Sequence, residues 1–135
     1  KLINGDDLNI ISDQRISMTC AKDLAHLIFL LSDATHREQA KLNQKKSTLH
    51  FTNKGFTTWF EVATHIKKQL SHDHSPLGTL SSISSSEWQA KANRPKDSRL
   101  TVSDDVLAAL NLACPSWQDR ITDVLQRLNY LRRNI

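Results

Sequence analysis

The stretch that decides the fold covers residues 49–61 and reads LHFTNKGFTTWFE. Its first part, Leu49–Asn53, has the character of a short strand, and Gly55 closes it because glycine accepts a positive φ. Thr58 and Glu61 then have the spacing of a capping box, in which a hydroxyl and a carboxylate each satisfy a free backbone donor at a helix start. A strand, a turn and a helix in this order indicate an α/β fold.

The same alternation continues on both sides of this stretch. Two further short strands are predicted at Leu8–Ser12 and Leu80–Ile83. Residues 32–47 carry no apolar periodicity, so a helix end and a loop are expected there. Helices are predicted at 20–31, 58–70, 103 onward and 116–133, from apolar spacing and from Ser/Asp start signals. We therefore expect an α/β fold with a few short strands in parallel arrangement and about four to five helices.

Each predicted helix should bury one apolar face. The side chains expected in these faces are Leu24, Leu27, Ile28 and Leu31, then Trp59, Val62, Ala63, Ile66 and Leu70, and finally Ile121, Val124, Leu125 and Leu128. Lys22 and Asp23 should point away from the core. Trp117 is also expected in the core, whereas Trp88 lies in a polar segment and is left open.

Composition limits the function classes. With 135 residues, 39% hydrophobic and 24% charged, the chain has the profile of one globular domain, and no apolar run reaches the roughly 20 residues of a membrane span. The net charge of +4 is scattered, which argues against a nucleic-acid partner. Cys20 and Cys114 form no metal or redox motif, so reduced thiols and a cytoplasmic location are expected. The start, without Met or a secretion signal, predicts a piece of a longer protein.

Four motifs in order resemble the C-terminal part of the dTDP-4-dehydrorhamnose reductases, a family of extended short-chain dehydrogenases. They lie at Asp13–Thr19 (family pattern D-Q-x-G-x-P-T), His50–Trp59 (H-x-x-x-x-G-x-T-T-W), Trp88–Leu100 (an aromatic, then A-x-R-P-x-x-S-R-L) and Pro115–Trp117. The first motif departs from the family, because Ile16 and Met18 replace its Gly and Pro. Two family prolines before Arg94 are also absent.

The resemblance implies that the chain is the C-terminal, substrate-binding portion of a Rossmann-type reductase. Residues 1–31 would be the last strand and helix of the Rossmann half, and 48–135 the sugar-nucleotide-binding lobe. The full-length parent would use NADPH or NADH to reduce dTDP-6-deoxy-L-lyxo-4-hexulose to dTDP-L-rhamnose. This chain has no glycine cluster, and its single tyrosine, Tyr130, is followed four residues later by Asn134 instead of Lys. Alone it should bind no cofactor and be inactive.

Five residues are candidates for holding the nucleotide sugar. Arg94 and Arg99 come first because a planar guanidinium suits phosphate oxygens, although both could instead tie down a loop. Gln14 and Thr19 follow a predicted strand, where α/β proteins bind ligands, and Trp88 could stack on a ring. Ser98 is interpreted as a cap or turn residue.

The sequence leaves other interpretations open. The chain could be a non-catalytic regulatory or nucleotide-sugar-binding module, similar to the regulatory subunit of methionine adenosyltransferase. The pair His72 and His74 is a weak metal signal without a third ligand. The expected partners are a dTDP-linked 4-keto-6-deoxyhexose and the missing Rossmann half, with a possible homodimer and no membrane or nucleic acid.

Overall fold

The computed structural model describes residues 1–39, 48–71, 76–88, 90, 92–102 and 104–133 of the 135-residue chain. These residues form two compact units, each assembled from separate stretches of sequence. Unit 1 comprises Lys1–Ile16, Phe56–Arg99 and Gln118–Ile135, and unit 2 comprises Ser17–Gly55 and Leu100–Trp117. The predicted α/β class, with short strands and about five helices, is confirmed.

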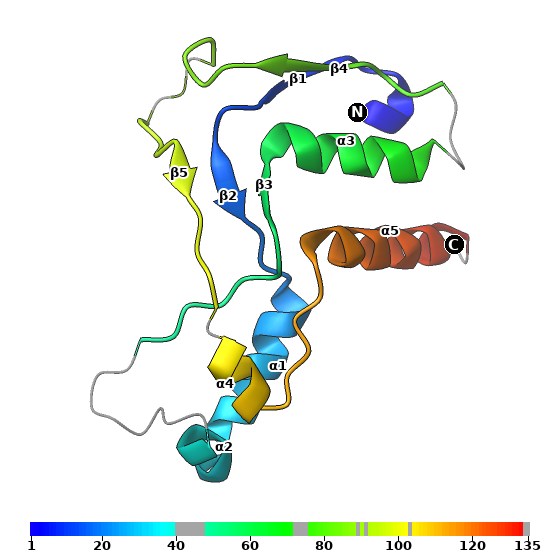
Figure 1. Ribbon diagram of the computed structural model, residues 1–135. Coiled ribbons are helices and arrows are strands. Elements are labelled where there is room, and N and C mark those ends of the chain that lie inside the picture. The colour runs from blue at the N-terminus through cyan, green and yellow to red at the C-terminus, as the bar shows by residue number, and fades with distance from the viewer. Residues whose placement is uncertain (40–47, 72–75, 89, 91, 103, 134–135) are drawn as a thin grey trace. The chain divides into compact units, whose positions relative to one another are not determined.

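A two-stranded parallel sheet lies in unit 1. A short 3-10 helix, Leu2–Asn4, precedes β1 (Leu8–Ile11), which pairs in parallel with β4 (Leu80–Ile83). The register joins Leu8 to Leu80 and Ile11 to Ile83, so both strands end at the same edge. α3 packs along β1 and β4, and Figure 1 shows the three elements close together. The strands predicted around Leu8 and Leu80, and their parallel arrangement, are confirmed.

A second sheet has the strand order β3-β2-β5 and was not predicted. It consists of β2 (Arg15–Ser17), β3 (Phe56–Thr58) and β5 (Asp97–Ser98), with β2 and β5 parallel. Strands of two or three residues are too short to produce an alternating pattern, which is why the sequence indicated only turns there.

The capping box of α3 (Trp59–Leu70) is confirmed. The Glu61 backbone N–H donates to Thr58 Oγ1 at 3.2 Å, and the Thr58 N–H donates to Glu61 Oε2 at 2.8 Å. Val62 and Leu70 are buried as predicted, but Trp59 is 47% exposed, so its assignment to the core is wrong. The apolar spacing identified the right face of α3 without revealing that this face is uncovered at its first residue.

The last helix, α5 (Trp117–Arg133), joins α3 within unit 1 through His65 Nε2 and Thr122 Oγ1, which lie 3.2 Å apart. Val124 and Leu128 were expected in the core, but they are 45% and 50% exposed. That prediction is wrong, because both side chains keep about half of their surface accessible.

The described residues of unit 2 contain three helices. α1 (Ala21–Ser32) leads into α2 (Ala34–Gln39), and α4 (Asp104–Ala109) follows Leu100–Val102. The buried core consists of Leu27, Phe51, Leu107, Leu110, Leu112 and Cys114. Leu27 is buried as predicted, whereas Leu24 and Ile28 are 37% and 60% exposed, so the predicted apolar face of α1 is only partly correct.

The predicted strand Leu49–Asn53 is wrong. Its residues form no ladder, and the pairing described next to them is a single bridge between Lys54 and Ser116. Asn53 is instead a buried junction: its Oδ1 accepts from the Cys20 N–H at 2.6 Å, and its Nδ2 donates to Asp23 Oδ2 at 2.5 Å. The expectation that Asp23 points away from the core is also wrong. Its carboxylate accepts the hydrogen bond from Asn53, and the residue is only 6% exposed.

The turn after Asn53 confirms the glycine prediction. Gly55 has a φ of +91°, and a Cβ at this position would lie 3.1 Å from Trp117 Cδ1. Trp117 is 6% exposed, so its predicted place in the core is confirmed. Both cysteines are free thiols, and burial raises the pKa of Cys114. No helix within the described part of the chain is long and apolar enough to cross a membrane.

Candidate functional site

A cavity of about 850 Å³ lies in unit 1, where β1 and β4 end. Its lining includes Ile11 at the end of β1, Gln14 just after it, and Ser85 and Ser86 just after β4. Ligands of open α/β sheets bind at the carboxyl ends of parallel strands, and this volume is within the range of small-molecule sites. The cavity is therefore the candidate functional site.

Gln14 supplies a polar group to the lining of the cavity. The residue is only 6% exposed, and its amide has no hydrogen-bond partner among the residues that the structure describes. A side-chain amide that reaches a cavity can exchange hydrogen bonds with water or with a ligand there. Gln14 can therefore both donate to and accept from a ligand in the cavity at no cost to an existing contact.

The turn after β4 is held by two carboxylates. Asp13 accepts from the Ser85 N–H and from Ser85 Oγ, both at 2.8 Å. Glu87 Oε2 accepts from the Ser84 N–H at 2.6 Å and from Ser84 Oγ at 2.7 Å. These bonds lower the pKa values of Asp13 and Glu87, so both side chains are ionised at neutral pH. The turn thus has a fixed shape where Ser86 and Trp88 line the cavity.

One face of α3 supplies an apolar surface. Four lining residues, spaced as i, i+3, i+4 and i+7, belong to a single stripe of this helix: Trp59, Val62, Ala63 and Ile66. Val62 is buried, whereas Trp59 is half exposed. Along α3, the cavity is therefore lined first by an aromatic ring and then by three aliphatic side chains.

Two cations and no carboxylate line the cavity among the described residues. Arg94 and Lys96 come from the segment before β5, and both side chains are exposed. Arg94 has no ion pair or hydrogen bond within the described part of the chain. An anionic group in this cavity would thus meet the Arg94 guanidinium and the Lys96 ammonium, the second of which also helps to lower the pKa of Asp13.

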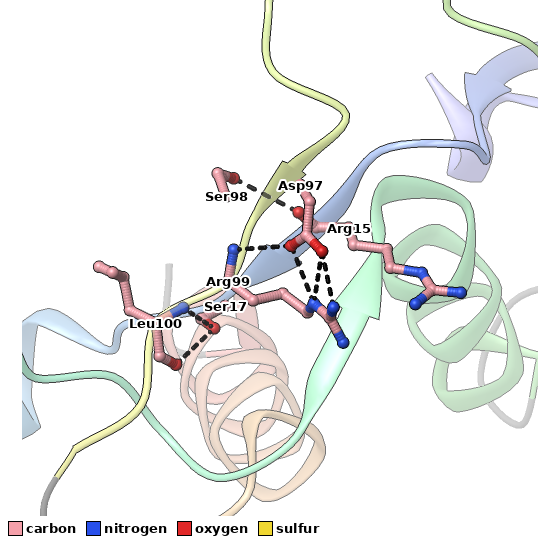
Figure 2. A network of polar contacts seen from close by, with 6 residues as sticks. All are labelled: Arg15, Ser17, Asp97, Ser98, Arg99 and Leu100. Atoms are coloured by element: carbon pink, nitrogen blue, oxygen red, sulfur yellow. Dashed lines mark hydrogen bonds and ion pairs between the residues drawn. The ribbon is translucent and has the colours of Figure 1, made fainter.

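A polar network fixes the chain immediately after Lys96, as Figure 2 shows. The Arg99 guanidinium donates to both carboxylate oxygens of Asp97, with Nη2 to Oδ2 at 2.6 Å and Nε to Oδ1 at 2.8 Å. These bonds lower the pKa of Asp97 to about 2. The Arg99 Cζ also lies 5.0 Å from the centre of the Phe56 ring, a cation–π contact.

The backbone extends this anchoring to β2. The Arg15 N–H donates to the Lys96 carbonyl at 2.8 Å, and Ser98 Oγ donates to the Arg15 carbonyl at 3.4 Å. Ser98, interpreted as a cap or turn residue, is therefore part of a strand. Within unit 2, Leu100 and Ser17 exchange two bonds of 2.9 Å, N–H to Oγ and Oγ to carbonyl.

Three of the five predicted site residues come together in the cavity, namely Gln14, Trp88 and Arg94. Arg99 is instead paired with Asp97, and Thr19 donates from Oγ1 to the Phe51 carbonyl at 3.2 Å in unit 2. The sequence interpretation missed Trp59 and Lys96. Lys96 carries a usable signal, because it is a second cation two residues after Arg94 in the same motif.

The structure describes no group of three His, Cys, Asp or Glu side chains that could hold a metal ion. The weak metal candidates His72 and His74 lie outside the described residues.

Comparison with known proteins identifies the family of the chain. The family model of the RmlD substrate binding domain matches residues 1–130. No curated protein matches the chain.

Similar solved structures include three dTDP-4-dehydrorhamnose reductases. The enzyme from Bacillus anthracis str. Ames, in complex with NADP, is 26% identical with a TM-score of 0.65. The match covers 90% of this chain and 38% of the Bacillus anthracis chain. The Clostridium acetobutylicum ATCC 824 protein is 22% identical, with a TM-score of 0.70 and coverage of 93% and 40%. The Yersinia enterocolitica enzyme is 23% identical, with a TM-score of 0.63 and coverage of 87% and 36%.

This chain thus spans roughly two fifths of the length of these reductases, between 36% and 40%. The latter two similarities, below 25% identity, concern the fold alone. The family model covers almost the whole chain. The chain therefore belongs to the RmlD substrate-binding domain family.

Proposed function

We propose that the cavity of unit 1 binds a dTDP-linked 4-keto-6-deoxyhexose and that the chain is the substrate-binding portion of a dTDP-4-dehydrorhamnose reductase. The observation that carries this proposal is the combination, in one cavity, of the Gln14 amide, which has no described hydrogen-bond partner, with the cations Arg94 and Lys96. A nucleotide sugar has the complementary groups, an anionic diphosphate and hydroxyl or carbonyl groups that exchange hydrogen bonds with an amide.

The roles follow from chemistry. Arg94 presents a planar set of donors that can bind two phosphate oxygens at once, and Lys96 adds a second positive charge. Gln14 would form a hydrogen bond with a hydroxyl or carbonyl of the ligand. Trp88, which is 52% exposed on the turn held by Asp13 and Glu87, offers a ring face. Arg99 would act indirectly, by holding the backbone that follows Lys96.

The chain's own residues do not fit the nicotinamide cofactor. Dinucleotide folds cradle the pyrophosphate in a glycine cluster between a strand and a helix. The three glycines here are Gly5, Gly55 and Gly78, which lie far apart in the sequence. Gly78 packs against the Asp6 backbone with no room for a Cβ, so its role is structural. We therefore assign NADPH or NADH, and the reduction to dTDP-L-rhamnose, to a full-length parent, and we expect this chain alone to be inactive.

The proposal also concerns the partner and the location. In the parent, residues 1–31 would close the Rossmann half and 48–135 would form the sugar-nucleotide lobe. Ile28 and Phe29 on α1, 60% and 72% exposed, would be covered by that half. We propose a cytoplasmic location, where nucleotide sugars are reduced, and homodimerisation stays a prediction for light scattering.

A second candidate is a non-catalytic module that binds a nucleotide sugar for regulation. It is favoured by Ile16 and Met18, which replace the Gly and Pro of the family motif, and by the position of Ile16 in β2, paired with Ser98. Fusing the chain to the Rossmann half of a reductase separates the two. Restored reduction of the 4-keto sugar supports the reductase, and tight binding without turnover supports the module.

The binding function itself is tested by calorimetry with dTDP. The wild-type chain should bind, and Arg94→Ala should weaken binding by about tenfold or more, because a charge-assisted phosphate contact is lost. Arg127→Ala is the matched control, since Arg127 pairs with Asp123 on the surface of α5 and should leave the affinity unchanged. Absence of binding by the wild type, or equal binding by Arg94→Ala, would contradict the proposal.

A further inference from the structure

We propose that Trp59, with the apolar stripe of α3 behind it, stacks on the nucleotide base, so that the cavity recognises a nucleotide diphosphate and not a free sugar or a sugar phosphate. This inference rests on the proposed function and assigns the base to one surface of the same cavity.

The exposure of Trp59 has no structural explanation within the described part of unit 1. The ring is 47% exposed, whereas Trp117 at the start of α5 is 6% exposed and packs over Gly55. The start of α3 does not need the indole, because Thr58 and Glu61 form the capping box without it. A large aromatic side chain left half exposed on the lining of a cavity is available for a ligand.

The neighbours of Trp59 in the lining suit a flat ring. Val62, Ala63 and Ile66 continue the stripe along α3, so the surface next to the indole is aliphatic. A charged or hydroxyl-rich group placed there would lose hydration without a polar partner, whereas a base would bury its faces favourably. Trp88, 52% exposed in the same lining, is a second aromatic that can contact the base or the adjoining ribose.

The two cations of the lining make the cavity selective for a base that carries phosphates. Arg94 and Lys96 come from a different stretch of chain than α3, and they attract the diphosphate. A ligand therefore gains the full affinity only when it carries both a base and phosphates. Thymidine and inorganic pyrophosphate should each bind much more weakly than dTDP.

The experiment compares three probes, dTDP, thymidine and inorganic pyrophosphate, on four forms of the 135-residue chain by calorimetry. The forms are the wild type, Trp59→Ala, Trp59→Phe and Phe29→Ala. Phe29 is the matched control, because it is an exposed aromatic, 72% accessible, on α1 in unit 2. Circular dichroism should give the same helix content for all four forms.

Trp59→Ala should weaken dTDP by about tenfold and leave pyrophosphate unchanged, because alanine removes the stacking surface and no phosphate contact. Trp59→Phe should recover most of the loss, and Phe29→Ala should bind as the wild type does. Equal dTDP affinities of the wild type and Trp59→Ala, or equal losses for dTDP and pyrophosphate, would overturn the role of Trp59 while leaving the nucleotide site in place. Failure of the wild type to bind dTDP would overturn the proposed function and this inference together.

Discussion

The carboxylate of Asp13 accepts both the backbone N–H and the Oγ of Ser85, at 2.8 Å each, across 72 residues of sequence. Asp7 makes the same pair of bonds to Thr79, at 2.8 Å and 2.6 Å, also 72 residues apart. The two pairs lie at opposite ends of the β1–β4 ladder, because Asp7 and Thr79 precede the strands and Asp13 and Ser85 follow them. The Asp13 pair lies beside the cavity, since Ser85 is one of its lining residues.

This relationship gives a matched pair of variants. Asp13→Ala should weaken dTDP binding several-fold, because the turn that carries Ser86 and Trp88 loses both of its bonds to Asp13. Asp7→Ala removes the equivalent bonds at the other end of the sheet and should leave the dTDP affinity unchanged while lowering the urea midpoint similarly. Equal effects of the two variants on affinity would show that Asp13 only supports the fold.

The pair of Asp97 and Arg99 predicts an acid-dependent loss of stability. Hydrogen bonds from Arg99 lower the pKa of Asp97 from 3.8 to about 2. The folded state thus favours the ionised carboxylate, so this stabilisation is complete above about pH 4 and is lost as the pH falls toward 2. Asp97→Asn should lower the urea midpoint at pH 7, and the difference from the wild type should shrink between pH 4 and pH 2. A constant difference over this range would contradict the assignment.

Gly55 and Gly5 allow backbone strain to be separated from steric contact. Both have positive φ, +91° and +84°, so alanine should cost about 1–2 kcal/mol of unfolding free energy at either position. A Cβ on Gly55 would also lie 3.1 Å from Trp117 Cδ1, whereas a Cβ on Gly5 would have no atom within 4 Å. Urea unfolding should therefore find Gly55→Ala less stable than Gly5→Ala. The reverse order would mean that Trp117 moves aside without cost.

The Asn53 junction should be the most sensitive polar position of unit 2. Asn53→Ala removes the acceptor for the Cys20 N–H and one donor to the buried Asp23 carboxylate, so we expect a loss of about 2–4 kcal/mol in unfolding free energy. Gln126→Ala, on an exposed position of α5, is the control and should change stability by less than about 0.5 kcal/mol. A small effect of Asn53→Ala would mean that water replaces the amide.

The features that could be predicted from the sequence are those encoded locally. The capping box of Thr58 and Glu61 and the strands at Leu8 and Leu80 depend on residues close in sequence, and the structure confirms them. The predicted strand Leu49–Asn53 failed because a strand needs a neighbour, and the Asn53 side chain makes its bonds elsewhere.

Burial was the less predictable property, because it depends on what covers a face. Apolar spacing placed Trp59, Val124 and Ile28 on the right helices but could not reveal that each remains uncovered. The same difficulty hid the site: Trp59 was assigned to the core from its spacing, and only the cavity reveals its place beside Val62 and Ala63. Gln14 and Arg94 could be predicted from strand-end position and side-chain chemistry.

The most direct test of the account is a titration of the ¹⁵N-labelled chain with dTDP, followed by NMR. The indole N–H signals of Trp59 and Trp88 and the amide signals of Gln14, Ser86 and Arg94 should shift together with one dissociation constant. The indole signal of the buried Trp117 should stay in place. Shifts confined to residues outside the cavity, or no shifts at millimolar dTDP, would contradict a nucleotide-sugar site at the carboxyl ends of β1 and β4.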